Sequence, residues 1–233
     1  MSVSTNPLSD NYFGVIDRIR STAERADRDP NSIQLIAVSK YVDTSMIRRL
    51  HELGCCHFGE SRPQVLWKKA KELADLDIHW HLIGHLQSNK IRRTIPATKL
   101  LHSGDSLRIL ELVNEEATKA GQVVDILAEV NISGDTSKHG FTQETLTKSL
   151  DRISNLENIC VQGLMAMAGR LGGTEQAKYD FEKMAVFREH LSQIAPDNLS
   201  MEELSMGMSG DFELAIQHGA TMVRIGSLLF KGT

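Results

Sequence analysis

The chain has 233 residues, of which 41% are hydrophobic and 24% are charged, and its net charge is −4 at pH 7. These values are typical of folded globular proteins and exclude a disordered chain. The slightly acidic balance offers no basic field for nucleic acid, and no stretch approaches the roughly 18 apolar residues of a membrane helix, so we expect neither partner.

The first predicted element is a helix from about Asn11 to Ala26, where Phe13, Ile16 and Ile19 recur at helical spacing. Short β-rich runs then alternate with amphipathic segments to the end of the chain. The predicted strands cover residues 34–40, 55–60, 78–84, 100–105, 124–133, 159–167, 204–209 and 222–230.

The clearest helical segment between two strands is "DTSMIRRLHELG", in which Asp43 can cap the N-terminus and Gly54 can end the helix. The segment "GDFELAIQHG" repeats this pattern with Asp211 and Gly219. Eight strands alternating with helices, without a Pro/Gly/Ser-rich linker, predict a single (β/α)8 TIM barrel with an extra N-terminal helix. One domain then covers residues 1–233. An open doubly wound sheet is the competing fold, but no G-x-G-x-x-G motif follows the first strand.

Three cysteines, Cys55, Cys56 and Cys160, follow neither a disulfide framework nor the spacing of a metal site. The N-terminus "MSVSTNPLSD" has no basic region followed by an apolar one, as a signal peptide would have. We therefore expect reduced thiols and a cytoplasmic protein.

Polar residues follow the predicted strands at their C-terminal ends, where barrel enzymes carry their chemistry. Ser-Gly and Gly-Ser steps follow strands seven and eight at Ser209–Gly210 and Gly226–Ser227. Each step by itself is an ordinary turn, but two steps at this corner predict a phosphate site built from hydroxyl and backbone N–H groups. The carboxylate of Asp211 disfavours an anion there unless it turns back to cap the next helix, which we assume.

A lysine, Lys40, ends the first predicted strand. Its ammonium group can simply reach solvent, or its amine can attack an aldehyde from a partly desolvated pocket and form a Schiff base. A phosphate site across the same barrel mouth favours the second alternative. An aldehyde that carries a phosphate describes pyridoxal 5′-phosphate (PLP), whose ring nitrogen Arg224 could meet.

Several motifs then match, in order, those of a known family. The segments "AVSK", "HFGES", "IHWHLIGHLQSNK", "VNISGDTSKHGF", "GLMAM", "LSMGMSGDFELAI" and "VRIGSLLF" resemble the pyridoxal phosphate homeostasis proteins. The resemblance implies a fold like the barrel domain of alanine racemase, PLP as cofactor, and a role in vitamin B6 and amino-acid homeostasis without recognised enzymatic activity. It also implies that Lys40 is the aldimine lysine and that Arg224 lies near the pyridine nitrogen. The implied phosphate ligands are Ser209, Gly210, Gly226 and Ser227.

Two segments depart from the family pattern. Ser61 stands where the family often has Asn after "FGE", so its contact with the cofactor would be shorter. The end, "LFKGT", differs from the usual "FG-x-R", and no role is assigned to it.

Related racemases add a second domain that supplies a tyrosine and a dimer partner, and no room for one remains after Phe230. Proton abstraction from a bound amino acid is then poorly supported. We expect a monomeric, non-catalytic PLP carrier whose partners are PLP and PLP-accepting apoenzymes. A racemase and a Schiff-base aldolase acting on a phosphorylated aldehyde are the alternatives.

A metal centre is a further alternative, because His79 and His81 share one strand face and His102 and His139 are available. No carboxylate lies on strand eight, where Arg224 places a cation, so we predict no metal and interpret these histidines as packed or pocket-lining. The glycines of "MAGRLGGT", residues 167–174, predict a mobile loop at the mouth.

Overall fold

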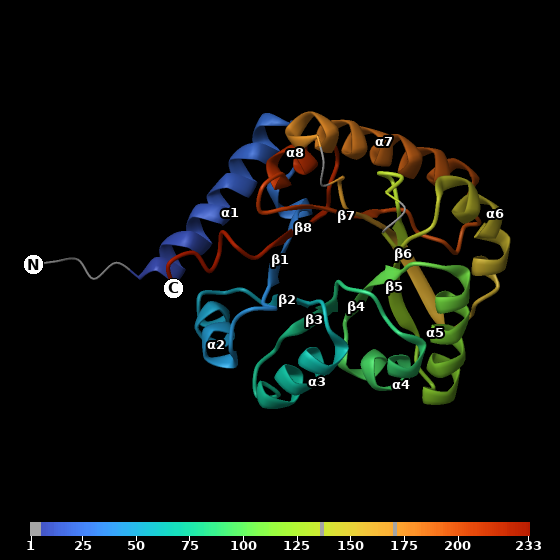
Figure 1. Ribbon diagram of the computed structural model, residues 1–233, viewed down its shortest axis with the longest axis horizontal. Helices are drawn as coiled ribbons and strands as arrows, with labels where there is room; N and C mark the ends of the chain where they lie inside the picture. Colours follow the sequence, from blue (N-terminus) through green and yellow to red (C-terminus); the bar gives the residue numbers. More distant parts are fainter. Residues whose placement is uncertain (1–5, 136–137, 170–171) are drawn as a thin grey trace, which may run out of the picture.

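The computed structural model describes residues 6–135, 138–169 and 172–233. Eight parallel strands form a closed barrel in which each strand pairs with its neighbours in the sequence and β8 pairs with β1 (Figure 1). The predicted (β/α)8 barrel is therefore confirmed. The strands are β1 (Gln34–Val38), β2 (His57–Glu60), β3 (His79–Leu82), β4 (Leu100–Gly104), β5 (Val124–Val130), β6 (Ile159–Ala166), β7 (Glu203–Met208) and β8 (Met222–Ile225).

Helices follow the strands and form the outer layer. They are α2 (Thr44–Glu52), α3 (Pro63–Glu72), α4 (Ile91–Thr94), α5 (Leu107–Ala120), α6 (Gln143–Ser154), α7 (Gly173–Ile194) and α8 (Phe212–Gln217), with α1 (Pro7–Arg25) before the first strand. Short 3-10 helices are η1 (Pro30–Ser32), η2 (Ser88–Lys90) and η3 (Ile95–Ala97). None of the helices in the described ranges is long and apolar enough to cross a membrane.

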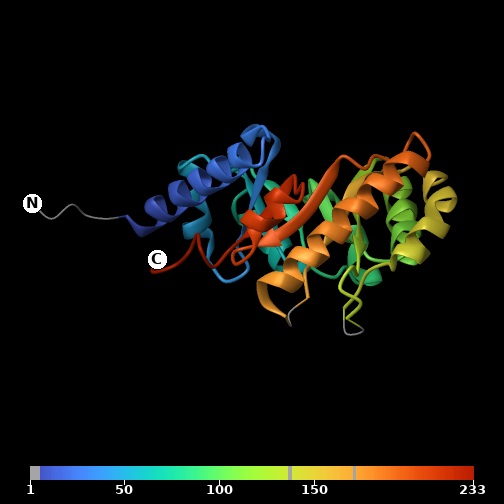
Figure 2. The same ribbon diagram turned by 90° about the horizontal axis from the view of Figure 1, so that it is seen from above.

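The extra helix α1 begins at Pro7, four residues earlier than predicted, because proline suits the first turn of a helix. Its buried residues, Leu8, Tyr12, Val15 and Ile19, belong to the core between strands and helices. The helix packs beside α8 and α2 in the outer layer (Figure 2).

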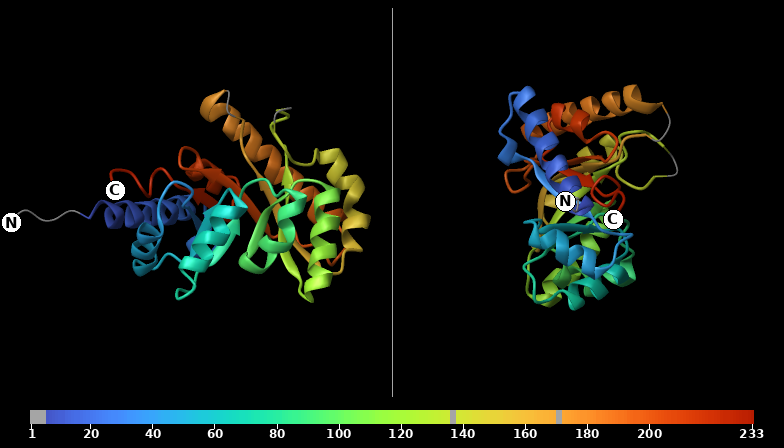
Figure 3. Two further views of the ribbon diagram at one scale, coloured as in Figure 1. Left: turned by 60° about the horizontal axis from the view of Figure 1, so that its bottom comes forward. Right: turned by 90° about the vertical axis from the view of Figure 1, so that its left-hand side faces the viewer.

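The two ends of the described chain lie close together (Figure 3). The side-chain amide of Asn11 in α1 donates hydrogen bonds to the carbonyl oxygens of Leu229, at 3.1 Å, and Lys231, at 2.8 Å. The C-terminal segment is thereby fastened to the first helix and returns toward the barrel mouth.

The element ends follow the local chemistry of the sequence. The predicted cap of α2 is confirmed, because Asp43 Oδ1 accepts a hydrogen bond from the Met46 N–H at 2.9 Å. The strand β8 ends at Ile225, five residues earlier than predicted. The carbonyl of Gly226 accepts from the N–H groups of Leu229 and Phe230, so a turn replaces the ladder there.

The barrel interior is filled partly by apolar side chains, a cluster made of Ile36, Leu100, Leu127, Met165 and Met222. Closure of the barrel depends on Gly163 in β6, where a Cβ atom would lie only 1.9 Å from the carbonyl oxygen of Glu203 in β7. Glycine is therefore required where these two strands meet.

The loops after β5 and β6 are joined by Lys138, whose Nζ donates to the carbonyl oxygens of Met167, at 3.2 Å, and Ala168, at 2.8 Å. Part of the predicted mobile loop, residues 170 and 171, lies outside the described residues. Its described flank is held by the buried Asp180, whose Oδ2 accepts from the Gly169 N–H at 2.7 Å. Mobility of this loop stays a prediction.

Candidate cofactor site at the barrel mouth

One cavity of about 990 Å³ opens at the C-terminal ends of the strands. It brings together all the residues that the sequence predicts to bind the cofactor, although they come from four different strands and the loops after them. These residues are Lys40, Ser61, Ser209, Gly210, Arg224, Gly226 and Ser227. The barrel closure explains this meeting, because parallel strands deliver their C-terminal ends to one rim.

The Ser-Gly corner after β7 and β8 has the donors of an anion site. The Gly226 N–H donates to Ser209 Oγ at 3.2 Å, which joins the two steps and leaves the Ser209 hydroxyl proton free to donate. Within the described ranges, the N–H groups of Gly210 and Ser227 donate to no protein acceptor. A Cβ atom at Gly210 would meet nothing within 4 Å, so the backbone there is open to a ligand.

The carboxylate of Asp211 does not cap α8 as the sequence reasoning assumed. Its Oδ1 accepts instead from the N–H of Met208, three residues earlier, at 2.6 Å. Burial raises the pKa of this carboxyl group, while the bond from Met208 and the charge of Arg224 act in the opposite direction. The carboxylate is thus bound to the end of β7 and not to the N-terminus of α8.

Lys40 follows β1, which pairs with β8 in the barrel, and its exposed side chain lines the cavity. Its Nζ lies 4.9 Å from the centroid of the Tyr41 ring, and Tyr41 itself is 89% exposed. The expected desolvation of Lys40 is therefore not provided by the protein, and the amine is free to change its rotamer.

Behind Lys40 lies a buried ion pair. Lys69 Nζ lies 2.6 Å from Glu60 Oε1, with side chains that are 9% and 1% exposed. The same Nζ donates to the Ser39 carbonyl oxygen at 2.8 Å, and the Ser39 hydroxyl donates to Glu60 Oε1 at 2.8 Å. These bonds fix the backbone next to Lys40 to β2 and α3.

Arg224 in β8 is buried and points its guanidinium into the barrel mouth. Its NH1 donates to Ser205 Oγ at 2.5 Å and its NH2 donates to the Ala166 carbonyl oxygen at 2.9 Å. Burial lowers the pKa of Arg224 to about 10, against the attraction of Glu129 and Asp211. The group therefore stays charged at neutral pH.

Below Arg224, four histidines form a hydrogen-bonded column through the barrel interior. We call His102, His81, His57 and His79 the histidine column. Each contact joins Nδ1 of one ring to Nε2 of the next, at 2.9 Å between His81 and His102, 3.0 Å between His57 and His81, and 3.2 Å between His79 and His57. At the top, His102 Nδ1 lies 3.0 Å from Ser205 Oγ.

This geometry assigns the tautomer of every ring in the column. Ser205 Oγ accepts from Arg224, and within the described residues the acceptor for its own proton is His102 Nδ1. His102 must then carry its proton on Nε2 and donate it to Nδ1 of His81. In the same way His81 donates from Nε2 to His57, and His57 donates from Nε2 to His79. Arg224 thus orients side chains down to the N-terminal end of the barrel.

Three of the column histidines, His57, His81 and His102, are uncharged at neutral pH. Burial and the neighbouring rings lower the pKa of His57 to about 4 and that of His81 to about 3, and they lower that of His102 well below its usual value. Of the four histidines predicted to be packed or pocket-lining, His79, His81 and His102 are hydrogen-bonded within the histidine column, which ends at Ser205, whereas His139 lies in the loop between β5 and α6, outside the column. The absence of a metal stays a prediction.

Several residues in the site or close to Arg224 carried no recognised sequence signal. Glu129 in β5 is buried, and burial together with the charge of Asp105 raises its pKa to about 7, against Arg224. Phe230 and Thr233 line the cavity, although the sequence reasoning assigned the chain end no role. The apolar wall also includes Met167 and Met208.

Comparison with known proteins places this barrel in a class. The family model of the alanine racemase N-terminal domain matches residues 16–233. An alanine racemase structure from Clostridium difficile shares the fold at a TM-score of 0.72 with 14% identity, and the match covers 95% of this chain and 55% of the racemase. The class is therefore the barrel of the alanine racemase N-terminal domain.

More similar proteins narrow the class. The pyridoxal phosphate homeostasis protein of Aquifex aeolicus is 39% identical over 93% of this chain and 94% of its own, and that of Pseudomonas aeruginosa is 38% identical over 96% and 94%. The structure of PipY from Synechococcus elongatus with PLP bound matches at a TM-score of 0.83 and 36% identity, covering 93% of this chain and 99% of that one. The chain belongs to the family of pyridoxal phosphate homeostasis proteins.

Proposed function

We propose that this protein binds PLP at the barrel mouth and serves in PLP and amino-acid homeostasis as a carrier without efficient turnover. The observation that carries the proposal is that one cavity is lined both by Lys40 and by the Ser-Gly corner after β7 and β8. The bound PLP of the PipY structure and the names of the relatives support it.

The residues present fit the three functional parts of PLP. When bound, PLP supplies an aldehyde that reacts with a primary amine. Lys40 would provide that amine, and Arg224 would direct a guanidinium N–H toward the ring nitrogen. Ser61 lines the cavity between these groups and β3. The phosphate would be held by Ser209, Gly210, Gly226 and Ser227. Within the described residues, the Ser209 hydroxyl and the N–H groups of Gly210 and Ser227 are free to donate to an anion.

The same cavity offers little support for proton transfer to a bound amino acid. Asp43 lines it, but hydrogen bonds from the Met46 N–H and the Ser45 hydroxyl lower the pKa of its carboxyl group and engage it as a helix cap. Arg224 stays charged, so its donor favours an unprotonated ring nitrogen and a weak electron sink. Glu129, whose pKa suits acid–base chemistry, is not among the residues described as lining the cavity. These features favour binding over catalysis.

Covalent labelling tests the binding part of the proposal. Purified protein loaded with PLP should absorb as an adduct of the cofactor, and borohydride reduction should leave pyridoxyl mass on the peptide that contains Lys40. Lys40→Ala should lose this mass, whereas Lys71→Ala, an exposed position on α3, should keep it. Pyridoxyl mass on another lysine, or none at all, contradicts the assignment.

Transfer of the cofactor tests the carrier part. Loaded protein mixed with a PLP-dependent apoenzyme should restore that enzyme's activity, and the loaded protein should show no measurable racemase, decarboxylase or aldolase turnover. Turnover of an amino acid or of a phosphorylated aldehyde, without transfer of PLP, would contradict the carrier function and favour the racemase or the aldolase.

We further propose that residues 1–233 act as one domain, as a monomer and in the cytoplasm. Light scattering after size exclusion should return the mass of one chain, and a dimer mass would contradict the monomer.

A further inference from the structure

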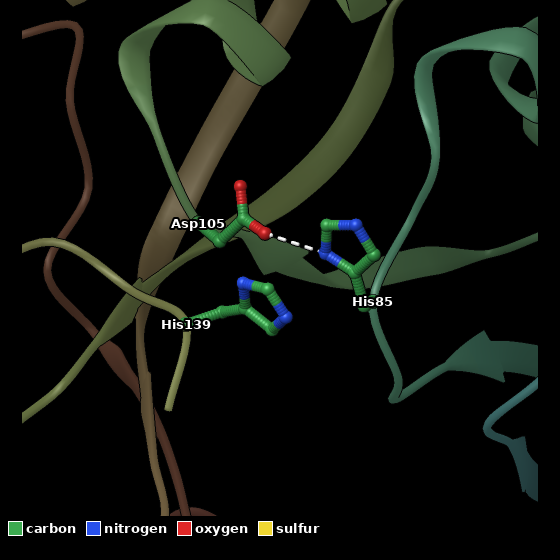
Figure 4. A group of neighbouring side chains, drawn as sticks. All are labelled: His85, Asp105 and His139. Atoms are coloured by element: carbon green, nitrogen blue, oxygen red, sulfur yellow. Dashed lines mark hydrogen bonds and ion pairs between the residues drawn. The ribbon is translucent and has the colours of Figure 1, made fainter. Parts of the chain in front are cut away.

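Three potential metal ligands meet at the barrel mouth on loops that the proposed PLP site does not use. His85 follows β3, Asp105 follows β4, and His139 lies between β5 and α6 (Figure 4). One ligand atom from each side chain lies within 4.8 Å of the other two. We call these residues the triad.

The carboxylate of the triad is buried and held in one orientation. The Asp105 side chain is 6% exposed, and its Oδ2 lies 2.8 Å from His85 Nδ1. Its Oδ1 accepts from the Ser106 hydroxyl at 3.0 Å, and Ser106 Oγ accepts in turn from the Ile109 N–H at the start of α5. Such outer hydrogen bonds orient metal-binding carboxylates in proteins, and here they direct Oδ2 at the imidazoles.

The two imidazoles are exposed and stacked, with ring centroids 4.3 Å apart and planes at 16°. The backbone next to His139 is anchored on β5, because the Phe141 N–H donates to the Glu129 carbonyl oxygen at 2.8 Å and the Asn131 N–H donates to the Phe141 carbonyl oxygen at 2.9 Å. A Cβ atom at Gly140 would lie 2.8 Å from the Asn131 nitrogen, so glycine permits this close approach.

We propose that the triad binds a divalent transition-metal ion. Two imidazoles and one carboxylate suit Zn²⁺, Fe²⁺ or Co²⁺ better than Mg²⁺ or Ca²⁺, which prefer oxygen ligands. Metal–ligand bonds of about 2.0–2.2 Å require the ligand atoms to approach one another further. Rotation of the exposed imidazoles can supply this movement toward the fixed carboxylate.

The remaining coordination positions would face a second cavity. This cavity has a volume of about 500 Å³ and is lined by all members of the triad and by Ser88 and Arg108. None of the residues assigned to PLP lines it. The proposed ion is thus open to water or a small anion, in the manner of sites with three protein ligands.

Cobalt titration tests the site in the full-length protein. Metal-free protein should bind one Co²⁺ with the visible absorption of a low-symmetry nitrogen–oxygen site, and Zn²⁺ should displace it. His139→Gln should weaken binding by more than the roughly 10- to 100-fold that loss of an outer-shell partner costs. His190→Gln, an exposed histidine on α7, should leave the titration unchanged.

Two further measurements keep the proposal open to refutation. His139 is exposed, so its variant should retain the wild-type unfolding transition. Covalent PLP labelling of Lys40 should be the same in both His variants, which separates this proposal from the proposed function. Absence of Co²⁺ binding to the wild type, or undiminished binding to His139→Gln, would overturn the site, because the ion would then bind elsewhere or not at all.

Discussion

Two parts of the cavity at the barrel mouth, which we call the Arg224 edge and the Lys40 edge, are built in opposite ways. At the Arg224 edge, the functional group is buried and belongs to a hydrogen-bond chain that continues through Ser205 into the histidine column. At the Lys40 edge, the functional group is exposed, and only the backbone beside it is fixed, through Ser39.

This difference matches the two tasks of the proposed site. Groups that recognise a ligand work best when they are held in place before binding, since less entropy is lost on complex formation. A lysine that must reach an aldehyde and release it again needs freedom to change rotamer, and its exposure provides that freedom. A carrier that both retains and releases its cofactor therefore combines one rigid edge with one adaptable edge.

The largest expected effect comes from breaking the buried ion pair between Lys69 and Glu60, which supports the backbone beside Lys40. Lys69→Met leaves the Glu60 carboxylate buried without a cation, and removal of one partner from a buried ion pair costs about 3–5 kcal/mol. Urea unfolding should show this loss of free energy, and the double variant Glu60→Gln/Lys69→Met should recover a large part of it. Equal losses in both variants would mean that packing by Lys69, not charge pairing, supports Lys40.

The next effect concerns the rigid edge. Arg224→Gln leaves Ser205 and the Ala166 carbonyl oxygen without their donor, and a buried polar group without a partner costs about 1–3 kcal/mol. The same variant should release PLP faster, which rapid filtration or dialysis would measure.

In the wild type, nitrogen NMR of the imidazoles should show the proton on Nε2 of all four column histidines. An Nδ1–H tautomer in any of them would contradict the orienting role of Arg224.

A smaller effect should appear when the column is titrated. The folded pKa of His57 lies near 4, below its usual 6.5, so between these values the unfolded chain binds a proton that the folded chain does not. Stability should therefore fall as the pH decreases from 6.5 toward 4, and further toward 3 through His81. His57→Gln should flatten the curve of unfolding free energy against pH by about one proton over the first interval. An unchanged slope would show that His57 is already charged in the folded state.

The last expected effect has the opposite sign. The folded pKa of Glu129 is about 7, above its usual 4.5, so its contribution to stability is present below pH 4.5 and is lost as the pH rises through 7. Glu129→Gln should therefore gain stability relative to the wild type between pH 5 and pH 8. Chemical unfolding at pH 5 and pH 8 measures the change in unfolding free energy. If the variant shows the same difference between the two pH values as the wild type, a group other than Glu129 binds the proton.

The sequence by itself determined the order of the elements and several residues of the cavity lining. The alternation of β-rich runs with capped amphipathic segments specifies eight βα units, and each unit ends its strand with the residues that reach the rim. For that reason Lys40, Ser209 and Gly226 could be identified from their positions next to strand ends. The overlong prediction for β8 arose because an apolar run continues past Ile225 into a turn, and periodicity does not separate the two.

Only the tertiary structure decided how distant residues combine. The histidine column requires the inward faces of β2, β3, β4 and β7 to meet, and the triad requires three successive loops to converge. The return of Thr233 to the cavity depends on the bonds from Asn11 to the C-terminal segment. The exposure of Lys40 was likewise set by packing around it. The physical reason is that local periodicity specifies which face of an element is apolar, whereas hydrogen-bond partners and burial arise only when the barrel closes.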